Sequence, residues 1–103
     1  MIADISTHRE ELRELCRRFH VRRLDVFGSA ARGDFDPARS DLDFLVEFEE
    51  SAPDALSLKA FFGFKEALER LFGRSVDLVE PGAVRNPYVK ASIERSRETV
   101  FAA

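Results

Sequence analysis

The chain has 103 residues, of which 45% are hydrophobic and 34% charged, and its net charge is −3. This length predicts one domain with a single hydrophobic core, spanning residues 1–103. The slightly acidic balance argues against a large nucleic-acid footprint, because such footprints need a basic face. We therefore expect no direct nucleic-acid substrate.

Cysteine usage and hydropathy bear on the compartment. The one cysteine, Cys16, cannot form an internal disulfide, which fits a reducing environment. The sequence shows no secretory signal and no apolar run long enough to cross a bilayer. We therefore expect a cytoplasmic protein with no membrane partner.

The first part of the chain predicts a helix, a strand and a turn-rich connection. Residues 7–10 have the pattern of a capping box, and the helix that it opens has an apolar face formed by Leu12, Leu15, Cys16 and Phe19. Residues 21–27 are rich in strand formers and predict a strand that ends at Gly28. A short helical turn over 29–32 and a loop over 34–39 follow.

The remainder alternates strands and helices. Residues 41–48 alternate between apolar and other side chains, which is the strongest strand pattern in the chain. A helix from about Pro53 to Gly73 carries a stripe of Leu58, Phe61, Phe62, Lys65, Leu68, Leu71 and Phe72. A strand over 76–79, a helix from Pro87 to about residue 95 and an edge strand over 99–101 follow. This order predicts an α/β (α+β) fold, a small mixed β-sheet with helices packed on it.

Asp41 and Asp43 are the most informative residues of the chain. Strands normally exclude aspartate, yet both residues occur in one predicted strand, and their spacing of two places both side chains on the same face. Neighbouring carboxylates repel each other unless cations or protons lie between them. Asp77 supplies a third carboxylate in another short strand. If that strand lies beside the first, all three carboxylates point into one site.

This arrangement is typical of metal-assisted phosphate chemistry. Phosphoryl and nucleotidyl transfer need cations that bridge substrate oxygens, and carboxylates hold those cations on the protein. Two such ions lie roughly 3.5–4 Å apart, and carboxylates at i and i+2 of a strand are separated by roughly 7 Å along the backbone. Asp41 and Asp43 would hold the metal of the triphosphate. Asp77 could ligate a second metal and accept the proton of an attacking hydroxyl.

The turn at Gly28 and Ser29 predicts a phosphate contact. Glycine lets backbone approach the phosphates closely, and Ser29 opens a helical turn whose amides point at an anion. Arg32 lies one turn further along and could clamp the same phosphates, with Arg39 a weaker candidate. Each motif alone is more often structural, since Asp-x-Asp usually lies in a surface loop and Gly-Ser is usually just a turn. The combination is what predicts a metal-dependent enzyme acting on a nucleotide.

The residues 26–33 and 40–46 together resemble the signature of the DNA polymerase β-like nucleotidyltransferase superfamily. That signature is an apolar residue, Gly-Ser, about ten residues, and then Asp-x-Asp in a strand. Residues 76–79 look like the strand with its third carboxylate. The short length, Pro81 and Asn86-Pro87-Tyr88 resemble the minimal nucleotidyltransferase (MNT) family.

The resemblance implies transfer of a nucleoside monophosphate, AMP from ATP, with magnesium (two ions expected) to a hydroxyl acceptor. It also implies an antitoxin that adenylylates a tyrosine of a cognate HEPN ribonuclease toxin, with which it forms a hetero-oligomer. Gly28, Ser29 and Arg32 then bind the nucleotide. Asp41, Asp43 and Asp77 then hold the metal and are catalytic. Minimal members lack the extra domain of larger relatives, so a partner is expected to complete the site.

Two other functions stay open at this stage. One is a non-catalytic antitoxin that blocks its partner by occlusion, for which exposed phenylalanines on the second long helix and the acidic balance would serve. The other is a small-molecule transferase of the aminoglycoside-modifying type, although the single-domain length makes it less attractive.

Overall fold

The computed structural model describes residues 3–28, 31, 41–49 and 58–103. The predicted loop over 34–39 and the predicted helix start near Pro53 lie outside these residues. The elements, in chain order, are α1 (Ala3–Thr7), α2 (Arg9–Arg18), β1 (Val21–Phe27), β2 (Leu42–Phe48), α4 (Leu58–Phe72), β3 (Val76–Val79), the 3₁₀ helix η1 (Pro81–Ala83), α5 (Pro87–Ser96) and β4 (Glu98–Ala102).

In the described part of the chain, four strands form one sheet in the order β3-β2-β1-β4. β1 pairs antiparallel with β2 and with β4, whereas β2 and β3 are parallel. The parallel pair needs a crossover connection, and α4 supplies it. The predicted mixed sheet is therefore confirmed, and β4 is an edge strand as expected.

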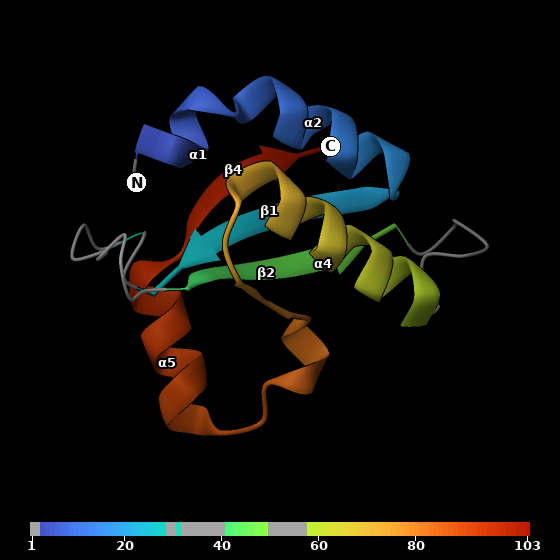
Figure 1. The fold of residues 1–103 in the computed structure, drawn as a ribbon. Coiled ribbons are helices and arrows are strands. Elements are labelled where there is room, and N and C mark those ends of the chain that lie inside the picture. The colour runs from blue at the N-terminus through green and yellow to red at the C-terminus, as the bar shows by residue number, and fades with distance from the viewer. Residues whose placement is uncertain (1–2, 29–30, 32–40, 50–57) are drawn as a thin grey trace.

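The helices cover the two faces of the sheet unequally. α1 and α2 lie along one side and α5 lies on the other (Figure 1). The side chains that β1, β2 and β3 send toward α2 and α4 belong to one buried cluster. Leu45 and Ile93 are also buried but lie outside that cluster, because Leu45 points to the opposite face of the sheet, where Ile93 of α5 lies near it.

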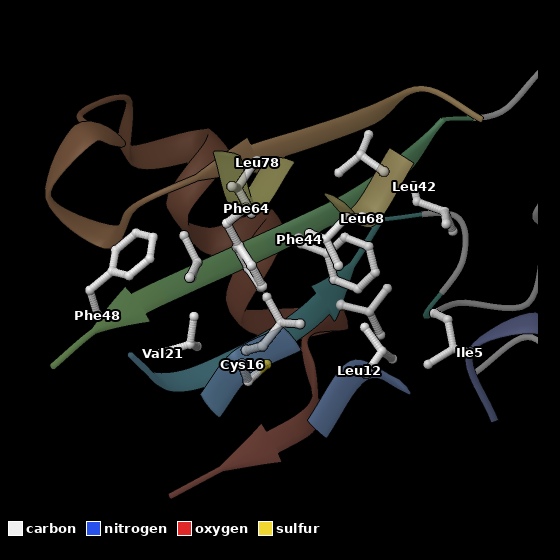
Figure 2. Close-up of a cluster of buried hydrophobic side chains, with 14 of the residues drawn as sticks. Ile5, Leu12, Cys16, Val21, Leu42, Phe44, Phe48, Phe64, Leu68 and Leu78 are labelled. Atoms are coloured by element: carbon white, nitrogen blue, oxygen red, sulfur yellow. The ribbon is translucent and has the colours of Figure 1, made fainter. Parts of the chain in front are cut away.

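The core fills the space between the sheet and the helices α2 and α4. Alternation along β2 sends Leu42, Phe44, Val46 and Phe48 into it, and the helices contribute Leu12, Cys16, Phe64 and Leu68. Figure 2 shows these side chains interdigitating between the strands and helices. Each large apolar side chain buried in this layer contributes about 1.5–3 kcal/mol to holding the sheet against α2 and α4.

One sequence-based prediction about the helices was wrong, and another was right only in part. Thr7 belongs to α1 and does not cap α2; the residue before α2 is His8, which makes no side-chain cap hydrogen bond. In the stripe predicted for α4, Phe61, Leu68, Leu71 and Phe72 pack on the core as expected. Leu58 and Phe62 are 75% and 56% exposed instead, and the fully buried Phe64 lies outside the predicted stripe. The periodic pattern could not decide among neighbouring phenylalanines, because adjacent aromatic residues fit more than one face.

Local interactions fix where β3 begins. Gly73 ends α4 with a φ of 66°, and its N–H donates to the carbonyl of Glu69 at 2.8 Å. The Glu69 carboxylate accepts from the N–H of Val76 at 3.2 Å, and the N–H of Leu42 donates to the carbonyl of Ser75 at 3.3 Å. The start of β3 is thereby held beside the start of β2.

None of the helices in the described part of the chain combines the length and the hydropathy that a membrane span requires.

Candidate active site

Asp43 and Asp77 lie side by side at one end of the sheet. They are register partners on the parallel strands β2 and β3, so both side chains leave the same face. That face is opposite to the core, because the flanking residues Leu42, Phe44, Val76 and Leu78 point inward. Asp43 is half-buried and Asp77 is exposed. The fold therefore places two carboxylates next to each other on an accessible surface.

Asp41 directly precedes β2 and is exposed. Among the described residues, no group of three or more histidine, cysteine, aspartate or glutamate side chains comes close enough together to hold a metal ion. The convergence of Asp41 with the other two carboxylates stays a prediction. The strand register places Asp43 beside Asp77, and it gives no position for the side chain of Asp41.

Gly28 directly follows β1 and lies next to Asp43. Phe27 is the register partner of Asp43 on the antiparallel strand, and Gly28 follows with a φ of 71°. A Cβ at this position would lie 2.5 Å from Oδ2 of Asp43, so only glycine fits without moving the carboxylate. The N–H of Ala31 donates to the carbonyl of Gly28 at 3.2 Å, which closes a turn. Ser29, Arg32 and Arg39 lie outside the described residues.

A cavity of about 470 Å³ opens beside this carboxylate. It is lined by Phe27, Gly28, Asp43, Tyr88, Val89, Ser92 and Ile93. The end of β1 and the start of β2 form one wall, and α5 forms the other. Ligand cavities of about 300–1,000 Å³ are the usual size for small molecules, so the space is large enough for part of a nucleotide.

Another hollow, of about 530 Å³, lies between α2 and β4. Its charged lining consists of Arg9, Arg13, Arg17 and Glu49, and none of the three predicted catalytic aspartates borders it. We therefore place the candidate site at the cavity beside Asp43, where the acidic groups and the glycine turn meet.

Residues that the sequence reasoning missed anchor α5 over the cavity. The N–H of Gly28 donates to Oγ of Ser96 at 3.1 Å, and Ser96 in turn donates to the carbonyl of Ser92 at 3.1 Å. Nε of Arg97 donates to Oδ2 of the fully buried Asp25 at 2.6 Å. Arg23 donates to the other carboxylate oxygen of Asp25 at 3.0 Å. The end of α5 is thus tied to β1 at two adjacent points.

The pairing of Arg97 keeps that residue charged. Partial burial acts to lower the pKa of Arg97, but hydrogen bonds and charges from Asp25 and Glu94 outweigh it and raise the pKa above its ordinary value. Asp25 is a charged residue between the core residues Leu24 and Val26. That position is a recognisable signal, because a carboxylate inside a strand needs a partner. The sequence does not identify Arg97 as that partner, since 72 positions separate the two residues.

Comparison with known proteins assigns the chain to a family. Residues 5–100 match the family described as "Nucleotidyltransferase domain". Over 97 residues the chain is 40% identical to "Protein adenylyltransferase MntA" of Thermococcus cleftensis, covering 94% of this chain and 87% of that protein. Over 90 residues it is 44% identical to a Methanocaldococcus jannaschii protein provisionally named a protein adenylyltransferase, covering 87% and 84% of the two chains.

Solved structures agree with this assignment. A structure provisionally described as a minimal nucleotidyltransferase is 36% identical, has a TM-score of 0.73, and the match covers 91% of this chain and 90% of the other. A second structure, of the Shewanella oneidensis HEPN toxin, tri-AMPylated and in complex with its MNT antitoxin, has a TM-score of 0.65 at 17% identity, covering 96% and 73%. At 17% identity, this second comparison shows that the two proteins share a fold.

The chain belongs to the nucleotidyltransferase domain family, with the DNA polymerase β-like fold, and it is a nucleotidyltransferase enzyme. Within that class, it is a minimal nucleotidyltransferase. The resemblance stated from the glycine turn and the aspartates is therefore confirmed.

Proposed function

We propose that the protein transfers AMP from ATP to a tyrosine hydroxyl of a HEPN ribonuclease toxin, and thereby acts as its antitoxin. The observation that carries the proposal is the pairing of Asp43 with Asp77 on adjacent parallel strands, beside the turn at Gly28. The names of the relatives supply the transferred group, since they are called protein adenylyltransferases. The toxin partner is suggested by a structural neighbour that was solved with a HEPN toxin.

At the α-phosphorus, the reaction forms one bond and breaks one. The acceptor oxygen attacks the α-phosphorus of ATP, the bond to the bridging oxygen of the β-phosphate breaks, and pyrophosphate leaves with the electron pair. In the proposed mechanism, Asp77 accepts the proton of the attacking hydroxyl, because it is the more exposed carboxylate of the pair. Ser29, Arg32 and the backbone at Gly28 are proposed to hold the triphosphate.

The carboxylate pair fits magnesium. Mg²⁺ prefers oxygen ligands and usually binds through one or two carboxylates, substrate phosphates and several waters. Two adjacent aspartates therefore suffice on the protein side, and a third carboxylate is not required for a first ion. Asp43, with Asp41 and Asp77, would hold the metal, which would neutralise charge on the phosphates. We propose a cytoplasmic location, where ATP and Mg²⁺ are both available.

The test is to incubate the protein with ATP, Mg²⁺ and its HEPN partner, and then to weigh the partner by mass spectrometry. We expect the mass of one or more AMP groups to be added to the partner at tyrosine. Chelation of divalent ions should stop the transfer, and added Mg²⁺ should restore it. Absence of added mass with ATP and with the other nucleoside triphosphates would overturn the proposal.

The charge of Asp43 gives a sharper control. Asp43→Asn keeps the shape of the side chain and removes its negative charge, so it should abolish transfer, while circular dichroism checks that the variant stays folded. Glu47→Gln makes the same change two strand repeats further along β2, on the same face, and should leave transfer intact. Equal loss in both variants would show that the effect comes from the strand and not from the carboxylate pair.

A second candidate function has one observation in its favour. Leu58 and Phe62 expose large apolar side chains on α4, and such residues could bind a partner without catalysis. In that case Asp43→Asn would still protect cells from the toxin. Full protection by this variant would favour occlusion, and loss of protection would favour adenylylation.

A further inference from the structure

Tyr88 lines the cavity of the candidate site. The side chain is 84% exposed, and Val89 beside it is 45% exposed. A single exposed apolar residue needs no explanation. Here, however, both residues line the same cavity as Gly28 and Asp43. An exposed aromatic side chain and an aliphatic side chain therefore share one cavity with Gly28 and Asp43, where the triphosphate is proposed to bind.

The helix that carries Tyr88 is held at both ends. At its start, Oδ1 of Asn86 accepts hydrogen bonds from the N–H groups of Tyr88 at 2.9 Å and Val89 at 3.4 Å. Pro87 occupies the first turn, where its fixed φ suits a helix start. At its end, Ser96 and Arg97 bind β1. The backbone under the ring is therefore ordered before any ligand arrives, which lowers the entropic cost of binding.

We propose that Tyr88 and Val89 form the platform on which the base of the nucleoside triphosphate stacks. The inference rests on the proposed function, and it adds where the base lies. The triphosphate extends toward Gly28 and Asp43, and the base lies against the ring of Tyr88 at the other side of the cavity. Every base has a π-face, so a platform of this kind favours nucleotides over bare polyphosphate without a hydrogen-bond code.

The composition of the chain makes this placement directly measurable. Tyr88 is the one tyrosine of the sequence, and there is no tryptophan, so tyrosine fluorescence reports on this ring alone. A base stacked on the ring should quench the emission. The full chain is titrated with a non-hydrolysable ATP analogue in the presence of Mg²⁺, and free tyrosine amide corrects for absorption by the nucleotide.

The expected result is saturable quenching by the analogue and unchanged emission with inorganic tripolyphosphate. Calorimetry under the same conditions measures binding of both ligands. If calorimetry shows that the analogue binds but the emission does not change, the inference is overturned. Equal quenching by tripolyphosphate also overturns it, because that ligand has no base.

Variants of Tyr88 separate the ring from the hydroxyl. Tyr88→Ala should weaken binding of the analogue roughly 5- to 150-fold, the effect of losing one stacked base, and should leave tripolyphosphate binding unchanged. Tyr88→Phe keeps the ring and should bind the analogue like the unmodified chain. Phe62→Ala removes an exposed aromatic side chain from α4, away from the cavity, and should change neither affinity.

These binding measurements require no acceptor. If AMP transfer fails while the quenching and the Tyr88→Ala effect are present, the proposed function is wrong and the base platform stands. If transfer succeeds while Tyr88→Ala binds the analogue normally, the platform is wrong and the function stands. Self-adenylylation of Tyr88, detected as added mass that Tyr88→Phe abolishes, would also overturn the platform, because an acceptor oxygen must reach the α-phosphate.

Discussion

Gly28 and Asp43 lie so close together that a Cβ on the glycine would approach Oδ2 of the carboxylate to 2.5 Å. Gly28 directly follows β1 and Asp43 lies in β2, and the antiparallel pairing of Phe27 with Asp43 brings them together. The identity of residue 28 therefore controls the position of a proposed metal ligand, in addition to the conformation of the turn.

A Gly28→Ala substitution should consequently reduce both stability and activity. An alanine held at the φ of 71° found at Gly28 should lower the free energy of unfolding by about 1–2 kcal/mol. The displaced Asp43 carboxylate should also lower the transfer rate roughly 100-fold. Gly73→Ala is the matched control, since Gly73 has a φ of 66° with no atom within 4 Å of its Cβ position. Chemical denaturation should show that backbone strain lowers the free energy of unfolding in both variants. The transfer rate should fall in Gly28→Ala alone. A normal rate for Gly28→Ala would contradict the proposed role of Asp43.

Asp77 should be required for catalysis and dispensable for folding. It is exposed on β3, so Asp77→Asn should leave the melting temperature unchanged. The transfer rate at saturating ATP and Mg²⁺ should fall about 100-fold or more, because several kcal/mol of charge stabilisation is lost from the metal site. Glu80→Gln, just beyond the same strand, should retain the rate of the unmodified chain. Retention of full activity by Asp77→Asn would remove Asp77 from the site.

The buried pair of Asp25 and Arg97 should dominate the stability of the α5 side of the sheet. Asp25 is fully buried, so Arg97→Ala leaves its carboxylate with Arg23 as the remaining cation, at an expected cost of about 3 kcal/mol. Arg70→Ala removes an exposed pair with Glu66, whose side chains are 78% and 62% exposed, and should cost less than about 0.5 kcal/mol. Urea unfolding of the two variants measures the difference. Equal losses would mean that burial of Asp25 has little energetic effect.

The burial of Cys16 should make the folded state less stable at alkaline pH. Burial raises the pKa of the Cys16 thiol from 9.0 to about 12, so the folded state keeps the proton longer than the unfolded state. The stabilisation is fully present below about pH 9 and is lost as the pH rises toward 12, by up to about 1.4 kcal/mol per pH unit.

The measurement is the free energy of urea unfolding between about pH 8 and pH 10.5, compared with Cys16→Ala, which cannot titrate at this position. The advantage of the unmodified chain over the variant should shrink above about pH 9. A constant difference across the range would show that the thiol titrates normally in the folded state. Iodoacetamide should label Cys16 slowly until the chain unfolds, because the reactive form is the thiolate.

Local sequence determined the elements of this protein well. Residues 21–27 and 76–79 form strands with the predicted bounds, and the predicted helix end at Gly73 and start at Pro87 are also confirmed. These features depend on side-chain alternation, on φ preferences and on caps within a few residues. The glycine turn and the Asp-x-Asp pattern likewise sufficed to recognise the family.

The tertiary structure alone decided which of these elements meet. The parallel pairing of β2 with β3 sets Asp43 beside Asp77. Arg97, just after α5, supplies the second cation that pairs with Asp25, and α5 brings Tyr88 to the cavity that Asp43 lines. No local pattern specifies these contacts, because a strand presents the same hydrogen-bonding edge to any partner. These contacts depend on how the helices pack on the core face of the sheet and on which distant residue pairs with a buried charge.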